Sequence, residues 1–319
     1  MTFDTDGYFD LGLRTPLLRV PTVYRRPSDS DNALGDAVGG LNYVFTRDLA
    51  LSVNAALATR RPLLLRGAPG AGKSTLARAL AGVRGCDFLL KVVNSDSKLE
   101  DLLWRYDHVR RLQDATDGER KIELDYEYVE PETLWWAIAP RSALGRGVEA
   151  RPLARPLTVP VQNLDGSPVL LIDEIDKADP ALPNDLLVAL GEGKFTIRET
   201  GETVLAEHVP LIVITTNDER ELSRPFMRRC IVVELPEPKG DALRAWLEAV
   251  GEAHFRDHMP LVGSVADFLV RTSAEATSAA EFVDLVRACV ELGMGTDHED
   301  FKLMLRLVTS KSRRASSGR

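Results

Sequence analysis

Five short runs of apolar residues recur along the first three quarters of the chain, separated by stretches with helical character. Short, almost purely apolar runs are typical of parallel strands that are buried on both faces of a sheet. Because strands that alternate with helices build parallel sheets, we expect an α/β domain with a five-stranded parallel sheet sandwiched by helices. The predicted strands cover residues 62–65, 88–93, 169–172, 211–215 and 231–235.

The pattern changes near residue 240, after which every periodic stretch is helical. Ser278 and Glu281 form a plausible capping box at the start of the clearest of these helices. Five apolar side chains follow on one face at helical spacing. They are Phe282, Leu285, Val286, Cys289 and Val290. We therefore expect a small all-α domain after the sheet, and a further helix over 42–58.

The length of 319 residues predicts one large domain and one smaller domain. Residues 1–35 mix proline, serine and acidic residues without periodicity, so we expect an irregular arm there. The α/β domain is predicted over 36–237 and the helical domain over 238–310. A short basic tail over 311–319 is expected to be disordered.

The α/β domain carries an inserted segment at about residues 105–167, because 100 residues separate Lys73 from Asp173. Its acidic part, 114–132, predicts a solvated face, and its Arg-, Pro- and Gly-containing part, 141–160, predicts a mobile loop. Since long loops in compact domains are often functional, this loop is also a candidate partner-binding element.

Composition excludes several classes of protein. No apolar stretch approaches the roughly 18 residues that a membrane span needs, and the acidic N-terminus lacks an export signal, so we expect a cytoplasmic protein without a membrane partner. The net charge of −8 makes nucleic acid an unlikely partner. Cys86, Cys230 and Cys289 show neither disulfide nor metal-site spacing and are expected to be buried thiols.

The first strand leads into a segment that matches the phosphate-loop pattern G-x-x-x-x-G-K-[ST] without a mismatch. Glycines let backbone N–H groups converge on phosphates, and the following helix directs its positive dipole end at them. Lys73 would supply a positive charge and the Ser74 hydroxyl would bind Mg²⁺. An ordinary glycine-rich turn is the alternative. The expected nucleotide-binding residues are Gly67, Ala68, Pro69, Gly70, Ala71, Gly72, Lys73, Ser74 and Thr75.

Two carboxylates, Asp173 and Glu174, end the apolar run at 169–172, which is a Walker B pattern. The strand would deliver Asp173 to the shell of Mg²⁺, while Glu174 can act as general base toward water. Adjacent acids after a strand can also be a mere loop start. Asp176 and Lys177 are expected only to orient the next helix.

With these motifs, residues 42–310 resemble the AAA+ superfamily of P-loop NTPases and, within it, the MoxR-like ATPases. The run 211–217 resembles the strand that ends in the sensor-1 residue, which implies that Asn217 lies near the γ-phosphate and the attacking water. An asparagine at a strand end is otherwise a turn residue. The period-two stretch 195–204 resembles the hairpin that precedes sensor 1.

The resemblance also covers 223–230, which is similar to the segment that carries the arginine finger. Arg229 is the first candidate and Arg228 the second, and such an arginine reaches the nucleotide of a neighbouring subunit. Ordinary surface arginines are the alternative. Asn94 matches a polar residue that restrains the catalytic glutamate. The chain departs from the family at 277–280, which lacks the sensor-2 arginine, and in its insertion at 140–166.

Taken as a MoxR-like protein, the chain is expected to bind and hydrolyse ATP with Mg²⁺ in a homo-oligomeric ring, a hexamer in our reading, and to remodel a client or a von Willebrand A-type partner protein. One alternative is a nucleotide-gated scaffold with negligible turnover, motivated by the absent sensor-2 arginine. A clamp-loader or helicase-like role on DNA is another. His254 and His258 lie four residues apart but lack the glutamate and third ligand of a zinc site, which favours a solvent-exposed helix face.

Overall fold

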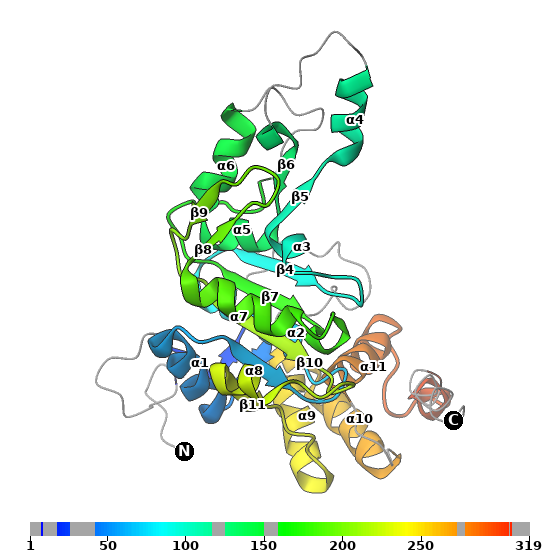
Figure 1. Ribbon diagram of the computed structural model, residues 1–319. Helices are drawn as coiled ribbons and strands as arrows, with labels where there is room; N and C mark the ends of the chain where they lie inside the picture. Colours follow the sequence, from blue (N-terminus) through cyan, green and yellow to red (C-terminus); the bar gives the residue numbers. More distant parts are fainter. Residues whose placement is uncertain are drawn as a thin grey trace. The chain divides into compact units, whose positions relative to one another are not determined.

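The computed structural model describes residue 8, residues 18–25, 42–116, 125–149, 159–272 and 278–305, and residue 307. The chain divides into two compact units, and Figure 1 labels the helices and strands along the chain. Unit 1 consists of residues 1–51, 67–79 and 234–319. Unit 2 consists of residues 52–66 and 80–233. The predicted tail at 311–319 and most of the predicted arm at 1–35 lie outside the described residues.

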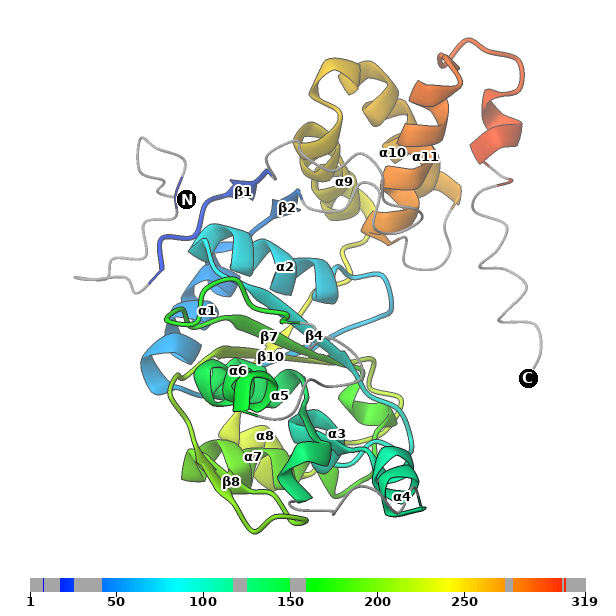
Figure 2. The ribbon, with the colours of Figure 1, turned by 90° about the horizontal axis from the view of Figure 1, so that it is seen from above.

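The main sheet is five-stranded and parallel, which confirms the predicted α/β class, and its strand order is β11-β3-β10-β7-β4. Figure 2 shows β4, β7 and β10 of this sheet from above. All six residues of the central strand β10 are buried, as an apolar run in the middle of a sheet requires. The strands are β3 (Leu63–Arg66), β4 (Phe88–Val92), β7 (Val169–Asp173), β10 (Leu211–Thr216) and β11 (Ile231–Glu234).

The register brings the carboxyl ends of these strands to one edge of the sheet. Thr216 of β10 pairs with Arg66, the last residue of β3. Ile214 pairs with Ile172 of β7, one residue before Asp173. The chain segments that begin at residues 67, 174 and 217 therefore all leave the sheet from this edge.

Helices flank the sheet in unit 2 and enclose its core. Trp135 is completely buried and meets Phe195 edge-on, with ring centroids 5.2 Å apart. This tryptophan therefore packs in the core and does not line an open site. The helices of this unit include α3 (Glu100–Leu103), α5 (Thr133–Ile138), α6 (Pro140–Glu149), α7 (Leu182–Glu192) and α8 (Arg224–Arg229). Helix α1 (Arg47–Thr59) and helix α2 (Lys73–Arg84) each have residues in both units.

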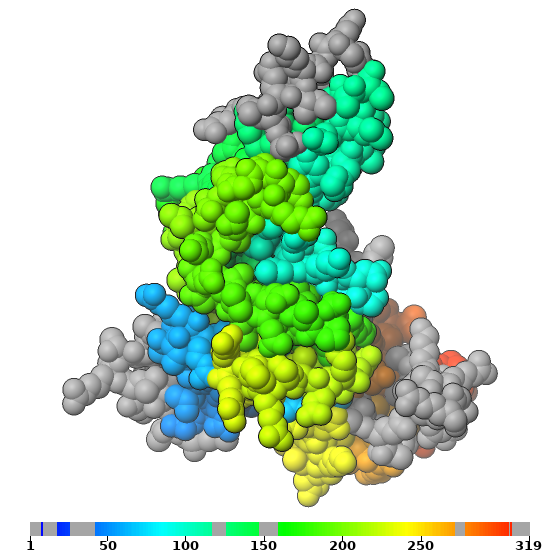
Figure 3. Space-filling model, in the orientation of Figure 1, coloured from blue at the N-terminus to red at the C-terminus, as the bar shows by residue number. Residues whose placement is uncertain are grey.

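The inserted segment is more ordered than its composition indicated. It forms β5 (Trp104–Tyr106), α4 (His108–Thr116), the 3₁₀ helix η2 (Asp125–Tyr128) and β6 (Val129–Pro131), with β5 and β6 antiparallel. The solvated face expected at 114–132 is wrong at its end, because Tyr128 and Val129 are buried. Helix α4, by contrast, has no buried residue and lies at the surface (Figure 3).

The mobile loop expected over 141–160 is also wrong for its first half, which forms α6. Ala139, directly before α6, and Ala143 within it are fully buried. Their small side chains let this helix lie close to its neighbours. The guanidinium group of Arg146 stacks over the Trp135 ring at 5.4 Å. Residues 150–158 lie outside the described part of the chain.

The predicted hairpin at 195–204 is confirmed as β8 (Lys194–Thr196) paired antiparallel with β9 (Thr203–Leu205). Phe195 points inward and stacks on Trp104 with a centroid distance of 5.8 Å. The hairpin is thus attached to the insertion through its buried face.

Unit 1 contains a short antiparallel pair, β1 (Val23–Tyr24) and β2 (Tyr43–Val44), and a helical region. The helix expected over 42–58 therefore began too early, because aromatic and β-branched residues at 43–44 pair with β1 and α1 starts only at Arg47. The helices are α9 (Gly240–His254), η4 (Arg256–His258), α10 (Met259–Thr272) and α11 (Ala279–Glu291).

The predicted capping box of α11 is confirmed. The Ser278 hydroxyl accepts a hydrogen bond from Glu281 N at 3.1 Å, and Ser278 N donates to Glu281 Oε2 at 3.2 Å. Phe282 and Leu285 of the predicted apolar face are completely buried against α9 and α10. Across the described ranges, every helix is too short or too polar to traverse a bilayer.

His254 joins the end of α9 to the residue before β2. Its Nε2 lies 3.2 Å from Asn42 O, and Asn42 Nδ2 donates to Ala253 O at 2.8 Å. Burial lowers the pKa of His254 to about 4, and the positive charge of Arg287 adds to this effect. His254 is therefore a neutral packing residue, and the solvent-exposed helix face that the sequence favoured is wrong for this histidine.

Candidate active site

The phosphate loop of unit 1 is built on glycine backbone geometry. Gly67, Gly70 and Gly72 have φ angles of 144°, 79° and 84°, which side chains on an L-residue rarely tolerate. Lys73 begins α2 and is 7% exposed. Its ammonium group donates to Gly67 O at 2.6 Å and Ala68 O at 2.9 Å. The loop thus closes around its own lysine.

The amino-terminal end of α11 lies directly against this loop within unit 1. A Cβ atom added to Gly70 would lie 2.4 Å from the Cβ of Ser278. Ser278 belongs to the stretch 277–280, where the sequence lacks the expected sensor-2 arginine. Thr277 of this stretch lies outside the described residues. Ser278 and the capping carboxylate of Glu281 therefore lie beside the phosphate loop, and neither carries a positive charge. Arg287 lies nine residues further and is 3.9 Å from Asp284 on the same helix.

In unit 2, one threonine bridges the two residues of the Walker B pattern, through the side chain of Asp173 and the backbone of Glu174. The Thr215 hydroxyl donates to Asp173 Oδ1 and accepts a hydrogen bond from Glu174 N at 2.9 Å. Thr215 is 1% exposed, so its hydroxyl is held firmly by the packing around it. The aligned ends of β7 and β10 therefore fix Asp173 and Glu174 relative to each other.

Glu174 adopts left-handed backbone angles of φ 61° and ψ 46°, which cost a non-glycine residue about 1–2 kcal/mol. Its Oε1 accepts a hydrogen bond from Asn217 Nδ2 at 3.4 Å and pairs with Lys177 Nζ at 2.9 Å. The hydrogen bond to Glu174 raises the pKa of Lys177. The structure thus brings together Glu174 and Asn217, two of the predicted site residues, and the role of Asn217 toward a nucleotide stays a prediction.

Asp176 holds the backbone of the Asn217 segment through hydrogen bonds, a role that the sequence interpretation missed. It is 3% exposed, and its Oδ2 accepts hydrogen bonds from Asn217 N at 3.2 Å and Glu219 N at 3.0 Å. Within the described part of the chain its Oδ1 is buried without a partner. A third acid shortly after the Walker B pair was the only signal in the sequence.

Asp218, between these two donors, also has a left-handed φ of 59°. Its carboxylate accepts a hydrogen bond from Arg66 Nε at 3.0 Å, which ties the segment after β10 to the last residue of β3. Strained non-glycine residues cluster at functional sites because the surrounding contacts hold them there.

Asn94, the predicted regulatory residue, is exposed and lies in a local turn after β4. Its Oδ1 accepts hydrogen bonds from Asp96 N at 3.1 Å and Ser97 Oγ at 2.9 Å. These bonds are typical of a turn asparagine. A restraining role toward Glu174 stays a prediction.

The sequence pattern that defines the AAA domain (dynein-related subfamily) matches residues 62–230, slightly more than half of the chain. The match begins just before β3 and ends just after α8. It therefore includes the phosphate loop, both carboxylates and the Asn217 segment. This chain belongs to the AAA domain family, dynein-related subfamily.

Two solved structures are similar to this AAA protein over most of its length, at low sequence identity. A RuvB mutant from Thermotoga maritima is 17% identical with a TM-score of 0.46, and the match covers 83% of this chain and 69% of that one. NtrX from Brucella abortus, solved in complex with ATP, is 15% identical with a TM-score of 0.47, and the match covers 85% of this chain and 55% of that one. No curated protein matches the sequence.

The two candidate finger arginines of the AAA domain, Arg228 and Arg229, end α8. Both side chains are exposed, and neither has a hydrogen bond or ion pair with any part of the chain that the structure describes. Their backbone is held instead, because the guanidinium group of Arg61 donates to the carbonyl oxygens of both residues.

A cage of protein ligands for a metal is not found among the described residues, where no group of three or more His, Cys, Asp or Glu side chains is arranged to hold an ion. Mg²⁺ does not need one, since it is usually bound through one or two protein oxygens together with phosphates and water. The carboxylate of Asp173, oriented by Thr215 at the end of a strand, is a protein oxygen of this kind.

Proposed function

We propose that this AAA protein is a MoxR-like ATPase that binds and hydrolyses Mg-ATP in a homo-oligomeric ring and uses the turnover to remodel or activate a partner protein, such as one with a von Willebrand A-type domain. The resemblance of the β8–β9 hairpin to the hairpin that precedes sensor 1 in MoxR-like proteins supports the subfamily. AAA domain membership supports the nucleotide chemistry.

One observation carries the ATPase proposal, namely the common edge at which β3, β7 and β10 end. Arg66 is in register with Thr216, and Ile214 with Ile172. The phosphate loop leaves the sheet directly after Arg66, and the carboxylates and Asn217 leave it after β7 and β10. Ligands of open α/β sheets bind at the carboxyl ends of the strands.

Each side chain then has a distinct role. The loop N–H groups and Lys73 would hold the phosphates, and Ser74 and Asp173 would hold Mg²⁺, which when bound neutralises charge on the phosphate oxygens. Glu174 would accept a proton from the attacking water, and Asn217 would orient that water. Lys177 Nζ is paired with Glu174 Oε1, so this oxygen has to exchange the lysine for the attacking water before Glu174 can act as a base.

The proposed ring follows from the arginines at the end of α8. A guanidinium group without a partner in its own described chain can complete the site of a neighbour, and such a trans finger is worth about 10³- to 10⁵-fold in rate. Hydrolysis would then depend on assembly.

The deciding experiment is the steady-state ATPase rate against protein concentration for the native chain, Glu174→Gln and Arg229→Ala. We expect the specific activity to rise with concentration, and both variants to lose at least 99% of it, with ATP binding retained. Arg224→Ala is the matched control, because it removes an exposed arginine from the other end of α8. Turnover that is independent of both concentration and Arg229 would contradict the ring.

A nucleotide-gated scaffold is the second candidate, and Ser278 with Glu281 at the sensor-2 position favours it. Without an arginine there, the helical region lacks a direct charge contact with the phosphates. In this case the native chain binds ATP but shows no turnover at any concentration, and Glu174→Gln leaves partner binding unchanged. Loss of partner activation in Glu174→Gln would reject the scaffold.

A further inference from the structure

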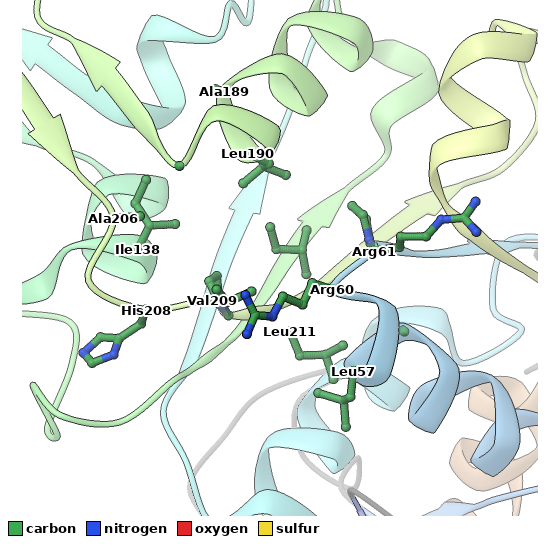
Figure 4. A pocket seen from close by; sticks show the side chains of 15 residues that line it. Leu57, Arg60, Arg61, Ile138, Ala189, Leu190, Ala206, His208, Val209 and Leu211 are labelled. Atoms are coloured by element: carbon green, nitrogen blue, oxygen red, sulfur yellow. The ribbon is translucent and has the colours of Figure 1, made fainter.

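Arg61 makes an unusual set of contacts for a residue between a helix and a strand. It follows α1 and precedes β3, and with Arg60 it lines a mostly apolar pocket of about 110 Å³. The two guanidinium groups point in opposite directions (Figure 4). That of Arg61 leaves the pocket and reaches the end of α8.

Three consecutive backbone carbonyls receive this one guanidinium group. Arg61 Nε donates to Arg229 O at 3.1 Å, and its Nη2 donates to Arg228 O and to Cys230 O, the latter at 2.8 Å. The last carbonyls of a helix have no partner within the helix and carry partial negative charge. Arg61 therefore terminates α8 with both hydrogen bonds and charge.

The neighbouring residue strengthens this attachment. Pro62 O accepts a hydrogen bond from Ile231 N at 2.8 Å, so residues 61–62 hold residues 228–231 through four hydrogen bonds. Helix α8 has only six residues, too few to be rigid alone. The backbone that bears Arg228 and Arg229 is thus fixed to the start of β3.

From this geometry we infer that Arg61 is the positioning residue of the arginine finger. The inference rests on the proposed trans finger and goes beyond it, because it assigns the finger's orientation to a residue that touches no nucleotide. A misplacement of about 1 Å can cost roughly 100-fold in rate. Lysine cannot replace Arg61 fully, since an ammonium group lacks the planar fork that reaches three carbonyls.

A subunit-mixing experiment separates positioning of the finger from damage to the subunit's own site. Arg61→Ala alone is expected to bind ATP normally and to lose about 10- to 100-fold in kcat, with Arg61→Lys intermediate. Mixed with Glu174→Gln, which has an intact finger and no base, it is expected to recover activity, because Glu174→Gln subunits donate fingers to intact Arg61→Ala sites. Mixed with the Arg228→Ala/Arg229→Ala double variant, it should show no recovery above its own reduced activity.

Arg60→Ala is the matched control. It removes the adjacent guanidinium group, which donates to none of the α8 carbonyls, and should leave kcat unchanged. The double variant mixed with Glu174→Gln tests the finger itself.

If the double variant with Glu174→Gln recovers activity while Arg61→Ala with Glu174→Gln does not, Arg61 acts on its own subunit and the inference is wrong. If neither mixture recovers, the trans finger fails and the inference fails with it. Should Arg61→Ala fold poorly by circular dichroism, Arg61→Lys in the same mixtures gives the same decision.

Discussion

Two buried side chains, Thr215 and Asp176, hold the residues that we propose to act on the attacking water. Thr215 bridges the side chain of Asp173 and the backbone of Glu174, and Asp176 binds two backbone N–H groups of the Asn217 segment. None of these hydrogen bonds is local, since each joins residues that are 41 to 43 positions apart in the sequence. The sequence could place Glu174 and Asn217 at strand ends by motif, but it contains no spacing rule for these supporting bonds.

Asp176→Ala is expected to lower kcat at least 10-fold with little change in ATP affinity, because the Asn217 segment loses both acceptors while the phosphate loop is untouched. Leaving backbone donors without partners costs about 1–3 kcal/mol. Steady-state kinetics and urea unfolding measure the two effects.

Asp165→Ala is the control for this variant, because it removes an aspartate with a 74% exposed side chain whose ion pair with Arg141 is on the surface. Such pairs contribute about 0–1 kcal/mol. An Asp176→Ala protein with native kcat would show that Asn217 needs no support, or takes no part in hydrolysis.

Apolar runs predicted the strands well because a strand buried on both faces admits almost no polar residue. All five strands of the main sheet start within one residue of the prediction. The insertion could not be predicted in this way, since α6 depends on small residues, Ala139 and Ala143, that fit against a neighbouring surface. Likewise β2 forms only because Val23–Tyr24 provides a partner strand.

Gly70→Ala tests the contact between the phosphate loop and the start of α11. A methyl group at a φ of 79° and 2.4 Å from the Ser278 Cβ must displace one of the two segments. We expect ATP affinity to fall at least 10-fold, as measured by titration with a fluorescent nucleotide. Adding Ser278→Gly, which removes the opposing Cβ, should restore part of the affinity.

Gly85→Ala separates the clash from the backbone strain. Gly85 has a φ of 60°, but an added Cβ would meet no atom within 4 Å. It should lower the melting temperature and leave ATP affinity unchanged. Equal affinity losses in both variants would refute the importance of the Ser278 contact.

At the scale of the whole molecule, the two units do not follow contiguous boundaries. Unit 1 combines three separate stretches of chain, of which 67–79 carries the phosphate loop. A sequence read from one end to the other predicts consecutive domains, so the boundaries at 36–237 and 238–310 stay predictions. The assembly of distant stretches depends on contacts such as those between Asn42 and the end of α9.

His254 couples this assembly to pH. Its pKa is about 4 when folded, against about 6.5 for an unperturbed histidine, so the folded state favours the neutral ring. The contribution of His254 to the free energy of unfolding is therefore fully present above pH 6.5. As the pH decreases toward 4, the free energy of unfolding falls by about 2–3 kcal/mol. Urea unfolding of the native chain and of His254→Gln between pH 7 and 4 tests this.

In His254→Gln that part of the pH dependence should be absent, because glutamine does not titrate. His258→Gln, which removes an exposed histidine nearby, should keep it. Identical pH profiles for the native chain and His254→Gln would show that the buried ring does not control the acid response.

Left-handed backbone angles occur at three non-glycine residues in the described part of the chain, and they divide into two kinds. Glu174 and Asp218 lie after strands that end at the same edge of the sheet, where Glu174 is the proposed general base and Asp218 binds Arg66. Arg60, with a φ of 55°, merely ends α1. For thermostabilisation, this makes Arg60 a position where glycine is expected to relieve strain without loss of activity, whereas the same relief at Glu174 would remove the proposed general base.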